Sequence, residues 1–295
     1  MTGQADGHGK MNSTTISICD MVDADLEAAD EILKLAFRSP VSRIHDLWLY
    51  RQIQPDGWFV ASQGERLIGM VGAANYGAFA HVGLMAVHPD LQRQGVGLAL
   101  MQHILTKLEQ QQVTKVMLDA SKAGRPLYEK LGFVAYDETL VFQRQGSIAG
   151  SVQTPHIQPM SVRELDELVQ WDTDVFGANR RRIFQVLFDA FPGRAFMQRD
   201  ADGRLAGYLF AQKNRIGPWV MFQSSNAEEL LQAALTLPYE GAISVMVPSV
   251  NGEAMELLQR HGFEQVRSNR HMGMGTDECP GQRQKIYAQT SLGVG

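Results

Sequence analysis

A buried strand followed by an amphipathic helix stands out in the pattern of hydrophobic and polar positions. The continuous apolar run from Val82 to Val87 is typical of a buried strand, and Pro89 ends it. Beyond a polar link, a helix is predicted from about Gly95. Its apolar residues recur every three or four positions, as on one helix face packed against a sheet; they are Leu98, Met101, Ile104, Leu105 and Leu108. Because the link is polar and joins two buried elements, we expect the chemistry of the protein there.

The same pattern predicts short elements on both sides of this unit. Upstream, apolar stripes and turn residues favour a strand, two helices and a pair of strands. Downstream, a strand leads to a short helix that Gly132 ends, because glycine tolerates the left-handed conformation behind a helix. The predicted helices cover residues 26–37, 42–53 and 125–131, and the predicted strands cover 16–21, 58–61, 67–76 and 113–118, with two closing strands in 133–144.

An internal repeat follows a segment that is rich in Gly, Ser, Gln and Thr. Residues 145–155 have little apolar content, which predicts a linker. Beyond it the order of elements recurs, and residues 255–263 echo 127–133. We therefore predict two domains, 14–144 and 156–295. In the second domain helices are expected at 161–169, 180–191 and 227–235, strands at 194–198, 207–212, 219–222 and 242–247, and a last strand within 286–292.

Composition limits the classes of function. The chain has 295 residues, of which 44% are hydrophobic, enough for two cores. Its formal net charge of −5 argues against general affinity for nucleic acid or an anionic membrane, and the basic run 180–182 is interpreted as a solvated helix face. Residues 1–13 are polar, which predicts a mobile tail and no signal peptide, and no apolar run has the length of a bilayer span. We expect a cytoplasmic protein without membrane or nucleic-acid partners.

Cysteine and histidine usage predicts no metal site. Cys19 and Cys279 lie far apart in different predicted domains, which favours neither a disulfide framework nor a zinc site. The histidines have no paired ligand spacing. This usage fits a reducing compartment.

The polar link has the features of a pyrophosphate cradle. Gly95 and Gly97 carry no side chain where the helix begins, so an anion can approach backbone N–H groups that lack an intrahelical partner. The helix dipole adds about half a positive charge there, and Arg93 adds a full one. No Gly-Lys-Ser/Thr follows, and the third glycine of a dinucleotide fold is missing. The alternative is a tight turn whose glycines serve packing alone.

Two motifs in this region resemble those of a known family. Gln92-Arg93-Gln94-Gly95-Val96-Gly97 matches the Gln/Arg-x-x-Gly-x-Gly/Ala motif of the GNAT superfamily of acyl-CoA-dependent N-acyltransferases. Val87-His88-Pro89 resembles its lead-in, and Leu127-Tyr128-Glu129-Lys130-Leu131-Gly132-Phe133 resembles its second signature. The resemblance covers about residues 15–144, and the repeat makes the chain similar to a tandem of two GNAT folds. It implies an α/β (α+β) fold in which each domain has a mixed, mostly antiparallel central sheet flanked by helices.

The resemblance also implies how acetyl-CoA is held as co-substrate. The backbone of Gln92, Arg93, Gln94, Gly95, Val96, Gly97 and Leu98 is expected to hold the pyrophosphate, and the strand residues Leu84, Met85, Ala86 and Val87 to pair with the pantetheine arm. Ser121 follows a strand at its carboxyl end, where open α/β sheets place ligands, and is predicted to form part of the wall. By family position alone, the acceptor pocket is expected to involve Phe37, Arg38, His45 and Arg51.

The repeat loses these features in the second domain, which we therefore predict to be degenerate. There the strand passes to the helix through residues 223–226 only, and Glu228 and Glu229 follow in the first helical turn. The two acids would repel a pyrophosphate. Leu258 occupies the position of Tyr128.

Tyr128 and His81 are the predicted catalytic residues. A neutral amine can attack the thioester directly, a free N–H near residues 84–86 can stabilise the oxyanion, and the phenol of Tyr128 is a reasonable acid for the leaving thiolate. Alternatively, Tyr128 only packs on the sheet. His81 is the predicted base because histidine titrates near neutrality. Tyr76, His88 and ordered water are weaker candidates, and Asp119 is a further polar residue that could instead serve as a helix cap.

These expectations lead to two hypotheses about function. The first is an N-acetyltransferase with one active site in the first domain, acting on a small-molecule amine such as a polyamine, an amino sugar or an amino acid derivative, with a peptide amine left open. The second is a non-catalytic acyl-CoA sensor or interaction module. A monomer or a homodimer fits either hypothesis.

Overall fold

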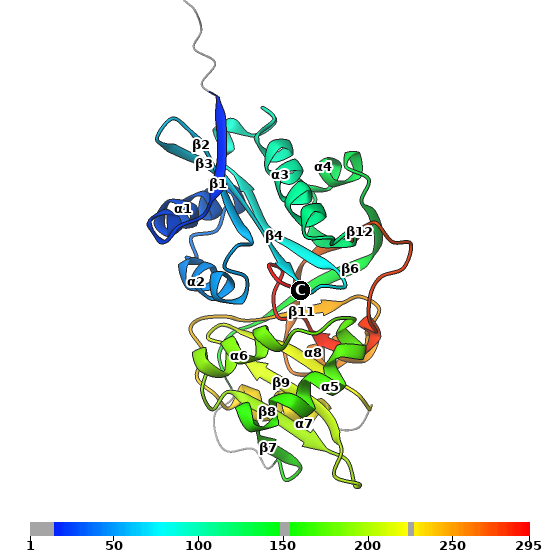
Figure 1. Cartoon of the computed structure of the whole chain (residues 1–295). Coiled ribbons are helices and arrows are strands. Elements are labelled where there is room, and N and C mark those ends of the chain that lie inside the picture. Colours follow the sequence, from blue (N-terminus) through cyan, green and yellow to red (C-terminus); the bar gives the residue numbers. More distant parts are fainter. Residues whose placement is uncertain (1–14, 148–153, 224–226) are drawn as a thin grey trace, which may run out of the picture.

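A computed structural model describes residues 15–147, 154–223 and 227–295. The predicted tail over residues 1–13 and most of the predicted linker lie outside the described residues. The described strands form one continuous 13-stranded sheet that runs through both halves of the molecule (Figure 1). Along this part of the chain, no helix combines the length and the apolar composition needed to cross a membrane.

The first half contributes five neighbouring strands and four helices. Strands β1 to β4 are antiparallel, and β5 runs parallel to β4. One apolar core cluster joins α1 and α2 to one face of the sheet, and another joins α3 to the opposite face. The strands are β1 (Ile16–Asp20), β2 (Trp58–Gln63), β3 (Arg66–Asn75), β4 (Ala80–Val87) and β5 (Val116–Ala120); the helices are α1 (Leu26–Phe37), α2 (Ile44–Ile53), α3 (Val96–Gln110) and α4 (Arg125–Lys130).

The second half repeats this order, as the internal repeat predicts. Strands β7 to β10 are antiparallel, and β11 runs parallel to β10. Helices α5 and α6 cover the sheet face that α1 and α2 cover in the first half, whereas α7 and α8 cover the other face. The strands are β7 (Ile157–Pro159), β8 (Ala195–Arg199), β9 (Leu205–Ala211), β10 (Arg215–Met221) and β11 (Ile243–Pro248); the helices are α5 (Leu165–Phe176), α6 (Arg181–Ala190), α7 (Ala227–Leu235) and α8 (Gly252–Arg260).

The two halves are joined by an exchange of strands. The prediction of two closing strands in residues 133–144 is wrong, because this segment is the single strand β6 (Val134–Arg144). The strand next to β5 is instead β12 (Glu264–Met274), which comes from the second half and lies between β5 and β6. In turn β6 pairs with β11 of the second half. The fold class is confirmed, and the sheets of the two GNAT-like units are continuous.

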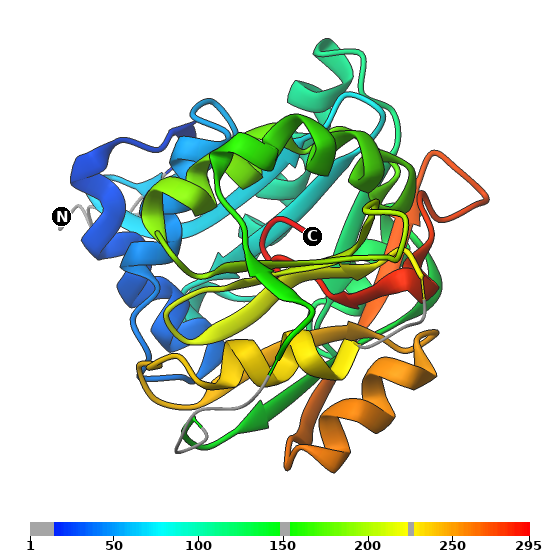
Figure 2. The same ribbon diagram turned by 90° about the horizontal axis from the view of Figure 1, so that it is seen from below.

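The C-terminal segment of the chain lies between the two halves. A short strand, β13 (Ile286–Ala288), pairs antiparallel with β10, so the last predicted strand is present over these three residues. Residues 289–295 then run into the interior, and Figure 2 places the C label near the centre of the molecule. Two hydroxyl groups of the first half hold this segment: that of Tyr50 donates to Ser291, and that of Tyr76 donates to the carbonyl of Val294.

Candidate active site

The central strands of the first half separate at their carboxyl ends. Only three residue pairs join β4 to β5, the last being Val82 with Leu118. At Leu84 the backbone has a φ of 49°, and the register between β4 and β3 shifts at the same place. The bulge turns the second half of β4 away from β5. Along Leu84–Val87, the edge of β4 that faces β5 therefore has no strand partner among the described residues, which leaves its backbone groups free for a ligand.

The turn that follows β4 presents unpaired N–H groups at the start of α3. Gly95 precedes the helix with a φ of 90°, and no side chain caps the helix start. Two side chains hold the loop in place. That of Gln92 donates to the carbonyl of Val87 at 3.1 Å, and that of Gln94 donates to the carbonyl of Asp90 at 2.8 Å. Gln92, Arg93 and Gln94 are exposed. A 15-residue helix thus directs the positive end of its dipole at an open turn.

Close packing does not explain the two glycines of the turn. A Cβ added at Gly95 would meet nothing within 4 Å, so its positive φ is the feature that requires glycine. A Cβ added at Gly97 would meet Leu127, Met85 and Val87 at 3.5–3.6 Å, which is ordinary contact. The protein itself leaves room for a small side chain at both positions. This argues against a turn whose glycines serve packing alone, and it fits a surface kept clear for a ligand.

Tyr128 and Ser121 lie together beside this turn. Tyr128 is 7% exposed, and burial raises the pKa of its hydroxyl to about 12. Its hydroxyl and the hydroxyl of Ser121 both approach Gly124, where an added Cβ would lie 3.5 Å and 3.4 Å from them. The Ser121 hydroxyl also accepts a hydrogen bond from the Gly124 N–H at 3.2 Å. A neutral phenol at this position can donate a proton across the whole physiological pH range.

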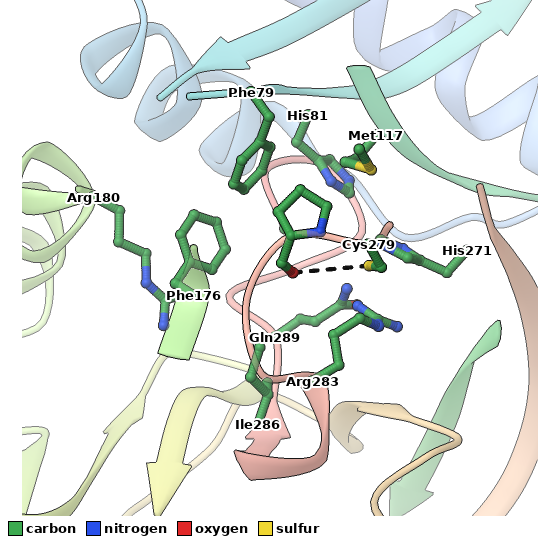
Figure 3. A pocket seen from close by; sticks show the side chains of 12 residues that line it. Phe79, His81, Met117, Phe176, Arg180, His271, Cys279, Arg283, Ile286 and Gln289 are labelled. Atoms are coloured by element: carbon green, nitrogen blue, oxygen red, sulfur yellow. Dashed lines mark hydrogen bonds between the residues drawn. The ribbon is translucent and has the colours of Figure 1, made fainter. Parts of the chain in front are cut away.

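His81 lies on the opposite face of β4, at a cavity between the two halves (Figure 3). Its neighbours on the strand, Ala80 and Val82, belong to the core under α3, so His81 faces the other side. Residues from both halves of the chain form the wall. The side chains of the lining are those of Phe79, His81, Met117, Phe176, Arg180, His271, Cys279, Pro280, Arg283, Ile286 and Gln289, and Gly295 completes it.

A carboxylate and two imidazoles meet behind this wall. The buried carboxylate of Asp119 lies 3.0 Å from Nδ1 of His271 and 3.7 Å from Nε2 of His81, and it accepts a hydrogen bond from Thr139 at 2.6 Å. Burial lowers the pKa of His81 to about 4, against the opposing effect of Asp119. The pKa of Asp119 is held below its usual value, chiefly because His271 offsets the desolvation of the carboxylate. Asp119 is therefore charged and His81 neutral at pH 7.

The structure corrects several expectations about polar residues. Asp119 is not a helix cap, because its carboxylate is buried in β5 and bound to His271 and Thr139. Arg180 is not part of a solvated helix face; it is 2% exposed, and its guanidinium forms two hydrogen bonds to Asp172, at 2.7 Å and 2.8 Å. The sequence shows only a basic run at this point, and no local pattern indicates that Asp172 pairs with Arg180.

The weaker candidates lie away from the reactive groups. His88 contacts Arg66 at 3.0 Å on the outer side of the turn. The hydroxyl of Tyr76 is used by Val294, and burial raises its pKa. None of the four residues predicted for the acceptor pocket lines the cavity; they are Phe37, Arg38, His45 and Arg51. The cavity is instead lined by His271 and Gln289, which no sequence motif indicates and which both come from the second half.

The second half has lost the corresponding opening. Strands β10 and β11 also separate after two residue pairs, but β13 lies in the gap. It pairs with β10, and the N–H of Gln289 donates to the carbonyl of Met246 in β11 at 2.8 Å. In α7, Glu228 and Glu229 form ion pairs with His261 and His156. Leu258 is fully buried.

No group of three or more His, Cys, Asp or Glu side chains that could hold a metal ion occurs in residues 15–147, 154–223 and 227–295. Cys19 and Cys279 are both free thiols.

Comparison with known proteins gives two separate domain matches. Models of the acetyltransferase (GNAT) domain match residues 29–149 and residues 168–288. The chain is 26% identical over 203 residues to the uncharacterized N-acetyltransferase YitH of Bacillus subtilis (strain 168), which covers 67% of this chain and 70% of that protein. It is 36% identical over 89 residues to the ribosomal protein bS18-alanine N-acetyltransferase of Escherichia coli (strain K12), which covers 25% of this chain and 60% of that protein.

Solved structures share the fold of the whole chain. A crystal structure from Pyrococcus horikoshii matches with a TM-score of 0.83 at 23% identity, covering 98% of this chain and 99% of that one. A GCN5-related N-acetyltransferase from Sphaerobacter thermophilus matches with a TM-score of 0.65 at 16% identity, covering 88% and 95%. One domain match falls on each half of the chain. The chain therefore belongs to the GNAT acetyltransferase family and is an acyltransferase built from two such domains in tandem.

Proposed function

We propose that the chain transfers an acetyl group from acetyl-CoA to a small-molecule primary amine at a single active site in the first module, residues 14–144. The second module, residues 156–295, is degenerate in this proposal. One contrast carries it: the gap between β4 and β5 is open, whereas the equivalent gap between β10 and β11 is filled by β13. GNAT enzymes use acetyl-CoA as co-substrate, and the first gap lies beside an uncapped glycine turn; residues 224–226 of the corresponding turn in the second half lie outside the described residues.

The backbone of the turn supplies the binding groups for the pyrophosphate. The N–H groups of residues 93–98 lie at the start of α3, whereas that of Gln92 donates to the carbonyl of Pro89 at 3.3 Å. Arg93 adds a full positive charge at the exposed rim. The pantetheine arm is expected along Leu84–Val87, where the unpaired strand edge offers backbone hydrogen bonds in place of a neighbouring strand. Ser121 would complete the wall on the far side of the gap.

The reaction requires one acid and one base. An amine that arrives as ammonium first gives a proton to His81, and its nitrogen lone pair then forms the C–N bond to the thioester carbonyl carbon. A free N–H of residues 84–86 stabilises the oxyanion. His81 passes its proton to solvent. As the oxyanion collapses, the C–S bond breaks, the nitrogen gives its second proton to solvent, and Tyr128 protonates the thiolate. Solvent reprotonates Tyr128, and the net products are the acetamide, CoA thiol and one proton.

His81 suits the accepting role because burial keeps the ring neutral. A base with a pKa of about 4 is weak against an alkylammonium in water, but the amine enters the same desolvated cavity, where burial lowers its own pKa against the opposing effect of Asp119. The negative charge of Asp119, 3.7 Å from Nε2 of His81, stabilises the imidazolium once it forms. His271 is proposed as a positioning residue, since it holds Asp119 in place from the exchanged strand β12.

A free-thiol assay separates this proposal from a non-catalytic acyl-CoA sensor. The full chain is incubated with acetyl-CoA and a panel of primary amines, and released CoA is measured with a thiol reagent against a sample without amine. Amine-dependent release supports the transferase. Tight binding of CoA by calorimetry without release from any amine would favour the sensor.

A further inference from the structure

The cavity between the halves contains two buried hydrogen-bond acceptors that have no donor. Nε2 of His81 and Oε1 of Gln289 are both inaccessible to solvent, and neither has a partner in the described structure. The ring of His81 donates its other N–H to the backbone of Leu292, which leaves Nε2 with a lone pair. Gln289 directs its amide nitrogen to Asp119 at 3.4 Å, which leaves its oxygen free. A buried acceptor without a donor costs about 1–3 kcal/mol, so the cavity favours a ligand that supplies N–H groups.

The charges around the cavity favour a cation and disfavour a second anion. Arg180 is bound to Asp172 through two hydrogen bonds, and Arg283 is bound to Asp137 through two hydrogen bonds of 2.8 Å. Both guanidinium groups are thus already paired. Within the described part of the chain, the buried Asp119 carboxylate has no guanidinium partner; it is bound by His271, Thr139 and the amide nitrogen of Gln289. A positive ligand is attracted to it, whereas a carboxylate would find no free cation.

The space beside the acceptors is small and apolar. The cavity is partly open, and its volume of about 30 Å³ has room for two groups of the size of a water molecule. Phe79, Phe176 and Met117 form an apolar cluster against it. An amino group and one methylene therefore fit, and a substituent on that carbon does not.

We infer that the cavity receives the reacting end of the acceptor as a primary amine on an unbranched methylene, whose N–H groups are donated to Nε2 of His81 and Oε1 of Gln289. The acceptor carries no carboxylate beside the amine. Gln289 is then an acceptor-binding residue that the second half contributes to the active site of the first. This inference rests on the proposed function and specifies its substrate class.

The first test compares amines that differ by one feature. Benzylamine presents an unbranched methylene, 1-phenylethylamine adds one methyl group at that carbon, and phenylalanine adds a carboxylate beside the amine. We expect kcat/KM for 1-phenylethylamine to be about 10- to 100-fold below that for benzylamine, because overpacking a buried site is costly. The value for phenylalanine should be at least ~100-fold lower, since its carboxylate would be buried without a partner. Values within threefold of one another would overturn the inference and leave the transferase proposal intact.

The second test removes the oxygen of Gln289. In Gln289→Leu the KM for benzylamine should rise about 10- to 100-fold, the effect of losing a hydrogen bond to a charged group, while the KM for acetyl-CoA stays unchanged. The unchanged KM for acetyl-CoA also reports that the variant is folded. Gln259→Leu, at an exposed position on α8, is the matched control and should alter neither value. An unchanged KM for benzylamine in Gln289→Leu would overturn the role of Gln289.

Calorimetry distinguishes failure of this inference from failure of the proposed function. Benzylamine is titrated into the chain without acetyl-CoA, and binding that weakens about tenfold or more in Gln289→Leu supports the site whether or not thiol is released. Binding that is equal in both proteins argues against the site, even if CoA release is robust.

Discussion

Tyr128 and His81 lie on opposite faces of the sheet, and burial keeps both in their neutral forms. The pKa of the phenol is raised to about 12 and that of the imidazole is lowered to about 4, in each case by desolvation. One residue is thereby kept as a proton donor and the other as a proton acceptor over the same pH range. This is the separation of pKa values that a paired acid and base require.

The role of Tyr128 can be measured by removing its hydroxyl. In Tyr128→Phe we expect kcat to fall about 10²- to 10⁴-fold, the usual contribution of general acid catalysis, with an unchanged affinity for CoA. Steady-state kinetics and CoA calorimetry provide the two values. Tyr239→Phe is the control, since that hydroxyl only donates to the carbonyl of Ala234 in the second half. A kcat within threefold of wild type would remove Tyr128 from the mechanism.

The lowered pKa of His81 makes stability depend on pH. In the unfolded chain the imidazole takes up a proton below its ordinary pKa of 6.5, whereas the folded protein resists this until about pH 4. The contribution of His81 to the free energy of unfolding is therefore complete above pH 6.5, and it is lost as the pH falls towards 4. Between pH 7.5 and 5 the loss should be about 2 kcal/mol, since it accumulates only below pH 6.5 and each pH unit there is worth ~1.4 kcal/mol.

Urea unfolding at pH 7.5 and pH 5 measures the loss of unfolding free energy, and this loss should be smaller in His81→Gln than in wild type. Asp119, His271 and Arg283 face the ring from β5, β12 and the segment before β13. Asp119 affects stability in a different pH range. Because its pKa is lowered in the folded protein, its contribution to the free energy of unfolding is lost only below its usual pKa near 4. An identical pH dependence in wild type and His81→Gln would contradict the assignment.

At the scale of elements, the proposed cofactor site depends on one helix start. Gly97→Glu adds a negative charge to the turn that is proposed to bind pyrophosphate, and should weaken CoA binding at least ~10-fold by calorimetry. Gly97→Ala should bind within about threefold of wild type, because a Cβ there meets its neighbours at 3.5–3.6 Å. Gly252→Glu, at the open start of α8, is a control for the added charge. Wild-type affinity in Gly97→Glu would place the coenzyme elsewhere.

The elements of the site follow from local sequence, but their partners do not. The apolar run into Gly95 and the stripe from Leu98 to Leu108 predict β4 and α3 because the pattern of each is set by its own buried face. The hydrophobic pattern does not predict strand β12. Residues 264–270 are mostly exposed, and the strand is fixed by hydrogen bonds to β5 and β6 instead of by a continuous apolar face. His271 could not be selected for the same reason, since it pairs with Asp119, 152 residues away. The position of Gln289 depends on the pairing of β13 with β10 and on its backbone hydrogen bond to Met246.

At the scale of the whole molecule, the two halves share one apolar core. A single cluster of buried side chains includes Leu47 of α2 and Phe184 of α6. The guanidinium of Arg215 crosses the boundary to Asp46 and to the hydroxyl of Tyr50. Because core and ion pair are common to both halves, we expect the molecule to unfold in one cooperative step.

Removing one partner of the crossing ion pair tests this coupling. Asp46→Ala leaves the buried Arg215 without its carboxylate, which should cost about 2–4 kcal/mol of unfolding free energy. Circular dichroism and tryptophan fluorescence should still report coincident transitions, since Trp58 and Trp219 lie in different halves. Glu240→Ala removes the partner of an exposed pair and should cost less than ~0.5 kcal/mol. Two separated transitions would contradict a shared core.

The exchange of β6 and β12 has a consequence during synthesis. When the ribosome has completed Arg144, the strand that closes the edge of β5 does not yet exist, and it is finished only at Met274. At ordinary translation rates the nascent first half therefore keeps an unclosed β5 edge for roughly 7 to 26 s. Throughout that interval the backbone of β5 offers a template for pairing with other chains, so we expect the risk of misassembly to be greatest before Met274 has been added.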